Sequence, residues 1–420
     1  FTEVLLCRIP CMVGSLACSA RMGDQGECPL DAGGYFVVNG NEKSVVAQEK
    51  MRTNFIFVKK QPRQVSAEIR SLHATKTRST STLVVNLCAR AGLRAETLEV
   101  RLPFVDFVIP AGVIFKLLGY ETLTEMCAFV ALQSADWSPA FADMVQRSLD
   151  HALLSESRAY LVEYLGREGT KEATMQRRVR YIEHILANEF LPHQGLDASP
   201  ATLHRKATYL STIIIKVLRV YSGVQAPDDR DDYALKRIET TGGLFALLFR
   251  QLFRQFLKML SLQLSRALES GKALPLVDAL HAKKITAGMK YAVSTGNWGI
   301  QKQSSQNGVA QILTRMNFLA GVSHLRRINT PINREGKLPK PRQLSASHCG
   351  VLCPVETPEG QACGLVENLA LLAHTRLGHD ATYIVQLLLD RQLIHVANTQ
   401  RGWWRVAVNG SIEGCVEDGH

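Results

Sequence analysis

The stretch Lys337–Leu365 reads KLPKPRQLSASHCGVLCPVETPEGQACGL, and it is the most informative part of the chain. Two prolines enclose a Glu-Thr pair in the run Pro354–Gly360, PVETPEG. Because proline fixes its own backbone angle and restricts the residue before it, this run predicts a rigid, non-helical loop. Lys337, Lys340 and Arg342 lie in a proline-spaced loop just upstream. Cations on one side of a rigid loop and carboxylates on the other indicate a place that holds a polyanion.

Positive charge gathers around this stretch. The 420-residue chain has a formal net charge of +11. Between His281 and Arg342 only one acid, Glu335, accompanies eleven cations, which are Lys283, Lys284, Lys290, Lys302, Arg315, Arg326, Arg327, Arg334, Lys337, Lys340 and Arg342. A local cationic field of this kind attracts phosphate backbones. The alternative is a solvated basic face without a ligand.

Length and composition predict a globular chain of two to four domains. Apolar residues make up 46% and charged residues 21% of the sequence, which is not the composition of a disordered protein. The ten cysteines contain no CxxC pair, so we expect free thiols in a reducing compartment and no zinc site. The sequence shows no signal peptide, and the apolar run 244–264 is interrupted by Arg250, Arg254 and Lys258, which argues against a membrane span.

The order of the expected elements predicts an α+β fold with mixed strands and helices. Asn39-Gly40 suits the type I′ turn of a hairpin between residues 35–38 and 44–47. Further strands are expected at 65–70 and 82–87, joined by a loop at 75–81. Helices are expected at 112–118, within 138–188, and at 203–221, 242–270 and 309–325. In the helix 242–270 a broad apolar face lies opposite Arg250, Arg254 and Lys258, which is typical of a packed domain helix, the alternative being a membrane-surface helix.

Six segments in the same order resemble the second-largest subunit of multisubunit RNA polymerases, nearest to the eukaryotic RNA polymerase II type and its archaeal and viral relatives. The segments are DAGGYFVVNGNEKSVVAQEKM (31–51), AEIRS (67–71), ANEFLPH (187–193), DDRDDYALKR (228–237), KYAVSTGNWG (290–299) and SHLRRINTPINREGKLPKPRQL (323–344) with the stretch that follows it. The resemblance covers almost the whole chain. It implies an internal fragment, truncated at both ends, of a subunit that takes part in template-directed RNA synthesis.

The resemblance also implies a division into named pieces. Residues 1–64 resemble the first part of the protrusion, and 65–187 the lobe. Residues 188–270 resemble the returning part of the protrusion, 271–370 the fork, and 371–420 the start of the external region. Residues 301–308 lie where fork loop 1 would be, and 329–337 resemble fork loop 2.

Site residues follow from this resemblance and from the charge pattern. We expect nucleic-acid contacts from Gln311, Arg326, Arg327, Arg334, Lys337, Lys340 and Arg342. Glu359 is expected near the active centre, where it orients a basic residue or braces the loop; a general base is the alternative. No catalytic residue and no metal ligand is expected in this chain.

The resemblance assigns the chemistry to the complete enzyme. Mg²⁺ would be bound mainly by the largest subunit and not by this fragment, which would be inactive alone. Expected partners are the DNA template, the RNA–DNA hybrid, the largest subunit and smaller subunits, without a membrane. The expected location is the nucleus, or the cytoplasm for an archaeal protein or a cytoplasmic virus.

Two rival functions use other features of the sequence. The first is a stand-alone, non-catalytic nucleic-acid-binding or scaffolding protein that reuses polymerase domains. The second is a metal-dependent nuclease that binds Mg²⁺ at Asp228, Asp229, Asp231 and Asp232. Since Arg230, Lys236 and Arg237 lie close in sequence, we interpret these aspartates as structural ion-pair partners.

Overall fold

The computed structural model describes residues 5–19, 28–62, 64–73, 80–88, 96–134, 137–170, 172, 174–271, 280, 283–299, 307–336, 338–394 and 403–416. The chain forms two compact units. The first unit comprises Phe1–Met51 and Asp231–Arg376, and the second comprises Arg52–Arg230 and Leu377–His420. Strands and helices are mixed in both, which confirms the α+β class.

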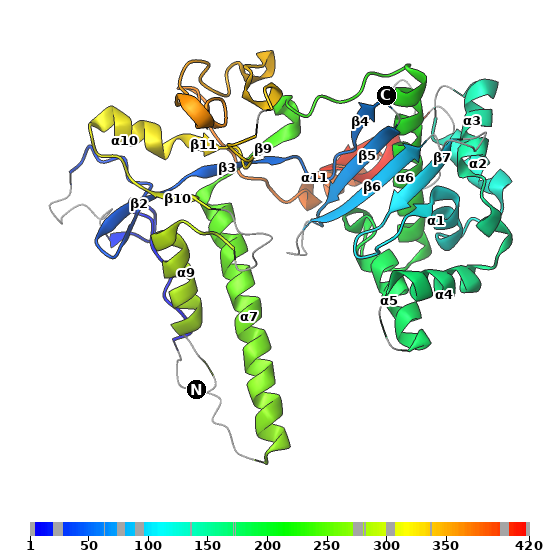
Figure 1. Ribbon diagram of the computed structural model, residues 1–420, viewed down its shortest axis with the longest axis horizontal. Coiled ribbons are helices and arrows are strands. Elements are labelled where there is room, and N and C mark those ends of the chain that lie inside the picture. Colours follow the sequence, from blue (N-terminus) through cyan, green and yellow to red (C-terminus); the bar gives the residue numbers. More distant parts are fainter. Residues whose placement is uncertain are drawn as a thin grey trace. The chain divides into compact units, whose positions relative to one another are not determined.

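The second unit is built on a five-stranded antiparallel sheet with the order β4-β5-β6-β7-β8 (Figure 1). Its strands are β4 (Phe57–Gln61), β5 (Gln64–Ser71), β6 (Ser81–Cys88), β7 (Thr97–Arg101) and β8 (Ile109–Pro110). Alternate side chains of β6 are buried, as a sheet with one face on the core requires. The expected strands at 65–70 and 82–87 are therefore confirmed, while most of the loop 75–81 lies outside the described residues.

Helices complete the core of the second unit. They are α1 (Ala111–Leu117), α2 (Leu123–Leu132), α3 (Pro139–Leu149), α4 (Arg158–Gly169), α5 (Met175–Asn188) and α6 (Pro200–Ser222). Helix α6 packs against β4, β5 and β6, and its Lys206 is fully buried and donates to Leu186 O and Ala187 O at 2.9 and 2.7 Å. These helices confirm the expected ones at 112–118, within 138–188 and at 203–221.

The late segment of the second unit adds α11 (Thr382–Asp390) and a hairpin of β13 (Trp404–Val408) and β14 (Ser411–Val416). Gln194 anchors the hairpin, because its Nε2 donates to Gly410 O and its Oε1 accepts from Ile412 N.

The first unit contains two small sheets. One has the order β1-β2-β10 and consists of β1 (Phe36–Val38), β2 (Asn41–Val45) and β10 (Ala310–Ile312). The other has the order β12-β11-β3-β9 and consists of β12 (Val366–Asn368), β11 (Arg327–Asn329), β3 (Ala47–Met51) and β9 (Lys236–Glu239). The φ angles of Asn39 and Gly40 are +52° and +76°, which confirms a turn of the type I′ kind.

Helices α7 (Thr241–Glu269) and α9 (Lys283–Thr295) pack side by side in the first unit (Figure 1). Leu244, Leu248, Leu252 and Phe256 are the buried residues of α7, and Arg250, Arg254 and Lys258 are exposed. The expected helix at 242–270 is confirmed as a packed domain helix.

The expected helix at 309–325 is only partly present. Residues 310–312 form β10, which pairs with β2, and α10 (Phe318–Leu325) begins after Asn317. The Asn317 side chain accepts a hydrogen bond from Ala320 N at 2.7 Å and so fixes the start of the helix. A strand of three residues gains its stability from its partner strand, which local periodicity does not reveal.

The two units have other boundaries than the named pieces expected from the resemblance. The chain passes between units after Met51, Arg230 and Arg376, whereas the expected boundaries fell at 64, 187, 270 and 370. Residues 188–230, with α6, belong to the second unit. The names of the pieces stay a prediction.

Candidate nucleic-acid interface

The predicted site residues cluster around β11 in the first unit. Helix α10 ends at Leu325, Arg326 is its C-cap, and Arg327 opens β11. Strand β11 lies between β12, to which it is antiparallel, and β3, to which it is parallel. This sheet therefore fixes the backbone at the two arginines.

The Arg326 guanidinium contacts main-chain carbonyl oxygens of the same unit. Its Nη2 donates to Ala370 O at 2.7 Å, and lies 3.3 and 3.4 Å from the carbonyl oxygens of Leu371 and Ala373. The side chain thus holds the turn that follows β12 against the end of α10.

Arg342 has a similar role between two loops. Its Nη1 donates to Gln361 O at 2.6 Å and Cys363 O at 2.9 Å, and its Nη2 donates to Arg334 O at 2.8 Å. At Gly364, which has a φ of +70°, a Cβ atom would lie 2.4 Å from Arg342 O. The close approach of the two loops therefore requires glycine at this position.

The other predicted cations differ in their surroundings. Arg334 is exposed and its Nη2 makes one long hydrogen bond, 3.3 Å, to Asn329 Oδ1. Lys340 is exposed in a short 3₁₀ helix. The Arg327 Nε is buried and has no hydrogen-bond partner among the described residues. Lys337 lies outside the described residues.

The proline-rich run folds as the expected loop, with residues 354–359 outside any helix. Thr357 Oγ1 donates to Val366 O at 3.0 Å and accepts from Gly364 N at 2.9 Å, and Glu356 accepts from Ser323 Oγ. Glu359 is exposed and forms no hydrogen bond or ion pair with any described residue. The loop is braced by Thr357 and Glu356. The role of Glu359 near the active centre stays a prediction.

Gln311 lies in β10 and is half-buried, and both the oxygen and the nitrogen of its side-chain amide contact other residues. Its Oε1 lies 3.1 Å from His324 Nε2, and its own Nε2 donates to Gly308 O at 3.0 Å. The preceding segment 301–308, expected at the place of fork loop 1, lies almost entirely outside the described residues.

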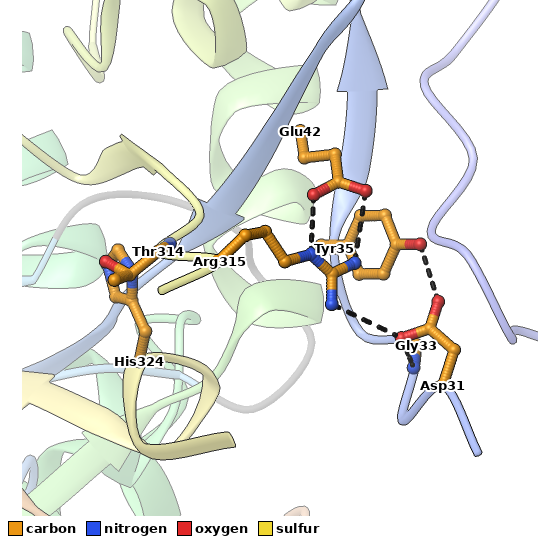
Figure 2. Close-up of polar contacts among 7 residues, drawn as sticks. All are labelled: Asp31, Gly33, Tyr35, Glu42, Thr314, Arg315 and His324. Carbon is orange, nitrogen blue, oxygen red and sulfur yellow. Dashed lines mark hydrogen bonds and ion pairs between the residues drawn. The ribbon is translucent and has the colours of Figure 1, made fainter. Parts of the chain in front are cut away.

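Arg315 belongs to a compact ion cluster that the sequence did not reveal (Figure 2). Its Nε and Nη2 donate to the two carboxylate oxygens of Glu42 at 2.7 and 3.1 Å, and its Nη1 lies 3.7 Å from Asp31 Oδ1. The guanidinium carbon lies 4.9 Å from the centre of the Tyr35 ring. Burial, together with the hydrogen bond that its hydroxyl donates to Asp31, raises the pKa of Tyr35 to about 12. The acids precede Arg315 by more than 270 residues, so no local signal predicted the contact.

A second charged group lies on the four-stranded sheet. Lys236 Nζ and Glu49 Oε1 form a buried ion pair at 2.9 Å. Burial first, and then the Glu49 charge, raise the pKa of Glu367 to about 7, although Lys236 opposes the shift. Glu49 Oε2, Glu367 Oε2 and the Tyr233 hydroxyl are buried without a hydrogen-bond partner among the described residues. This group places the buried Glu49 and Lys236 beside the partly buried Glu367.

The aspartates at 228–232 are divided between the units. In the second unit, Asp228 Oδ2 pairs with Lys216 Nζ at 2.7 Å and accepts from Val58 N. In the first unit, Asp232 Oδ1 accepts from Ala234 N and caps a 3₁₀ turn. Lys216 was not among the partners expected from sequence, because it lies on α6.

The His, Cys, Asp and Glu side chains of the described residues are the possible ligands of a metal ion. Among those residues, no group of three or more His, Cys, Asp or Glu side chains could hold a metal ion. Among the same residues, no helix is long and apolar enough to cross a membrane.

Comparison with known proteins identifies the class. The family model for the RNA polymerase beta subunit matches residues 1–287, and that for RNA polymerase Rpb2, domain 3, matches residues 311–375. The chain belongs to this family, that of the second-largest RNA polymerase subunits. The second match covers most of β10, all of β11 and β12, and all the predicted site residues.

Individual relatives come from eukaryotes and archaea. DNA-directed RNA polymerase II subunit 2 of Arabidopsis thaliana is 38% identical over 92% of this chain and 34% of its own length. RNA polymerase II subunit RPB2 of Eremothecium gossypii is 38% identical over 98% of the chain and 35% of its own length. Subunit Rpo2N of Methanothermobacter thermautotrophicus is 31% identical over 92% of the chain and 77% of its own length. The chain thus spans about a third of the eukaryotic relatives that it matches.

Proposed function

We propose that the chain acts as part of a DNA-directed RNA polymerase, in which its residues 307–371 contact nucleic acid at the fork of the transcription bubble. The single observation that carries this proposal is a fixed backbone that carries solvent-exposed cations. Arg342 and Thr357 hold two loops rigidly, and the same loops expose the cations Arg334 and Lys340. A phosphate contact gains from such pre-organisation because few groups must be ordered on binding.

The fold divides the basic residues into two groups. Arg315 is neutralised by carboxylates, and Arg326 and Arg342 donate to main-chain carbonyl groups. We therefore assign the phosphate contacts mainly to Arg334 and Lys340, and a supporting role to Arg326 and Arg342.

The chemistry itself belongs to other parts of the enzyme in this proposal. Following the family resemblance, we assign the catalytic Mg²⁺ to the largest subunit as a partner, and the isolated chain is expected to be inactive. Template DNA, the RNA–DNA hybrid and smaller subunits are the further partners proposed. Nuclear location fits the names of the RNA polymerase II relatives, and cytoplasmic location the archaeal ones.

The test is binding of a fluorescent bubble-containing DNA to the chain at several salt concentrations. The double variant Arg334→Ala/Lys340→Ala should bind more weakly, and the slope of log affinity against log salt should fall by about one unit for each lost phosphate contact. The control is Arg147→Ala/Arg167→Ala, which removes the same charge from exposed ion pairs of the second unit. Equal slopes for wild type and the Arg334/Lys340 variant would contradict the proposal.

A further inference from the structure

His324 lies in the last turn of α10 with 3% of its surface exposed. Its ring is in contact with two residues of the preceding segment. Thr314 N and Thr314 Oγ1 each lie 3.2 Å from Nδ1, and Gln311 Oε1 lies 3.1 Å from Nε2. Figure 2 shows the Thr314 and His324 side chains next to each other.

The contact with Thr314 decides which ring nitrogen carries hydrogen. A backbone N–H can only donate, so Nδ1 must accept and has no hydrogen of its own. The Thr314 hydroxyl can donate or accept, and beside this Nδ1 it can only donate. In the neutral ring the hydrogen is then on Nε2. Burial, and after it the charge of Arg327, lowers the pKa of His324, which favours the neutral ring.

The ring in turn decides the orientation of the Gln311 amide. Because Nε2–H donates, the amide oxygen must face His324 and the amide nitrogen must face away. One N–H of that nitrogen donates to Gly308 O. An amide nitrogen carries two hydrogens, so a second N–H is left over, and no described residue accepts it.

We propose that His324 is a positioning residue that fixes Gln311 as a hydrogen-bond donor toward an acceptor oxygen of nucleic acid, such as a phosphate oxygen. The Thr314 N–H determines which imidazole nitrogen carries hydrogen, and the imidazole in turn determines the orientation of the Gln311 amide. Without the histidine, the amide is free to turn and to present its oxygen, which repels a phosphate. The identity of the ligand rests on the proposed function, whereas the orientation of the amide rests on this chain alone.

The orientation is tested in the free chain by long-range proton–nitrogen correlation NMR with ¹⁵N-labelled histidine. The His324 signals are assigned as those missing from His324→Leu. At pH 7 we expect the neutral ring with hydrogen on Nε2. A hydrogen on Nδ1, or a doubly protonated ring, would overturn the inference whatever the chain binds.

The consequence for binding is tested with the same bubble-containing DNA. Gln311→Glu keeps the size of the side chain but replaces the donor with an acceptor, so affinity should fall about tenfold. Gln255→Glu on the exposed side of α7 adds the same charge and should change affinity less than twofold.

A double variant separates positioning from general support of the fold. If His324 acts through Gln311, adding His324→Leu to Gln311→Glu should cause no further loss of affinity. Losses that multiply would overturn the inference. Failure of the wild-type chain to bind the DNA would instead count against the proposed function, and would leave the NMR result to decide the orientation of the amide.

Discussion

At the scale of single residues, arginines of one sequence motif have different tasks. Arg326 and Arg342 donate to carbonyl oxygens of neighbouring loops, whereas Arg334 is largely open to solvent. A planar guanidinium can donate to several carbonyl groups at once, and lysine cannot reproduce this geometry. Charge alone therefore does not indicate which of these cations is available to a ligand.

The role of Arg342 can be tested by a substitution that keeps the charge. Arg342→Lys should lower the free energy of unfolding by about 1–3 kcal/mol, because several carbonyl groups lose a charged donor. Chemical denaturation measures this change. Arg334→Lys, which loses one 3.3 Å hydrogen bond, is the control and should have little effect. Equal stability of the two variants would show that the Arg342 contacts contribute nothing.

Glu367 predicts a pH dependence of stability. Its pKa is raised from 4.5 to about 7 in the folded chain, so the folded state holds this proton more tightly than the unfolded state. The stabilising contribution is complete below about pH 4.5 and is lost as the pH rises through 7. Glu367→Gln should therefore be more stable than wild type at pH 8, by about 1–3 kcal/mol, and nearly equal to it at pH 4.5.

Denaturation curves at the two pH values provide the measurement. The matched control is Glu335→Gln, at an exposed acid of the same unit, which should show no such difference. A Glu367→Gln chain that is less stable than wild type at pH 8 would mean that the charged carboxylate is stabilised by Lys236, contrary to this account.

At the scale of elements, the packing of α7 on α9 depends on a glycine. A Cβ atom at Gly288 would lie 2.4 Å from Leu252 Cδ2, and Leu252 is buried in α7. Gly288→Ala should therefore destabilise the chain by about 1–3 kcal/mol, since a packed core resists added volume. The control is Gly242→Ala in α7, where nothing lies within 4 Å of the Cβ position. This substitution should stabilise the chain by up to about 1 kcal/mol.

Thermal melting of the two variants tests this prediction. In a Leu252→Ala background, Gly288→Ala should lower the melting temperature by less than it does in the wild type if the two side chains compete for the same space. A melting temperature that rises in both glycine variants would contradict the close contact.

Elements with a strong local signal were the predictable ones. The turn at Asn39-Gly40, the strands β5 and β6 and the helix α7 follow from turn chemistry and periodicity. Strand β10 was expected to be helical, because its three residues are extended only by pairing with β2. The contacts of Arg326 and Arg342 could not be predicted either, since their acceptors are main-chain carbonyl groups, which every residue possesses.

At the scale of the whole molecule, each unit has its own buried core. Leu244, Met289 and Trp298 belong to the core of the first unit, and Ile69, Leu83 and Leu210 to that of the second. Units with separate cores can unfold in separate steps. The sequence predicted several domains, and each of the two units is built from two separate segments of the chain. The division at residues 64, 187, 270 and 370 that the resemblance implies stays a prediction.

Tryptophan fluorescence can follow the first unit selectively. Trp298 is the one tryptophan of that unit's sequence; it is 5% exposed, and its Nε1 donates to Leu244 O at 3.0 Å. The fluorescence that disappears in Trp298→Phe is the signal of the first unit. We expect Gly288→Ala to shift the midpoint of the unfolding transition seen in this signal. Leu83→Ala, in the second unit, should leave that midpoint unchanged. A single transition shifted by both substitutions would show that the units unfold together.

The strand order β12-β11-β3-β9 affects how the protein folds during its synthesis on the ribosome. Strand β3 ends at Met51, but its parallel neighbour β11 begins at Arg327 and the edge strand β12 ends at Asn368. At about 5–20 residues per second, an emerging β3 waits roughly 15–60 s for these partners. During that interval residues 52–230 can already form their own five-stranded sheet, while β3 leaves one edge unpaired until β9 (Lys236–Glu239) emerges and the other until β11 emerges. The first unit should therefore depend on chaperones during translation far more than the second.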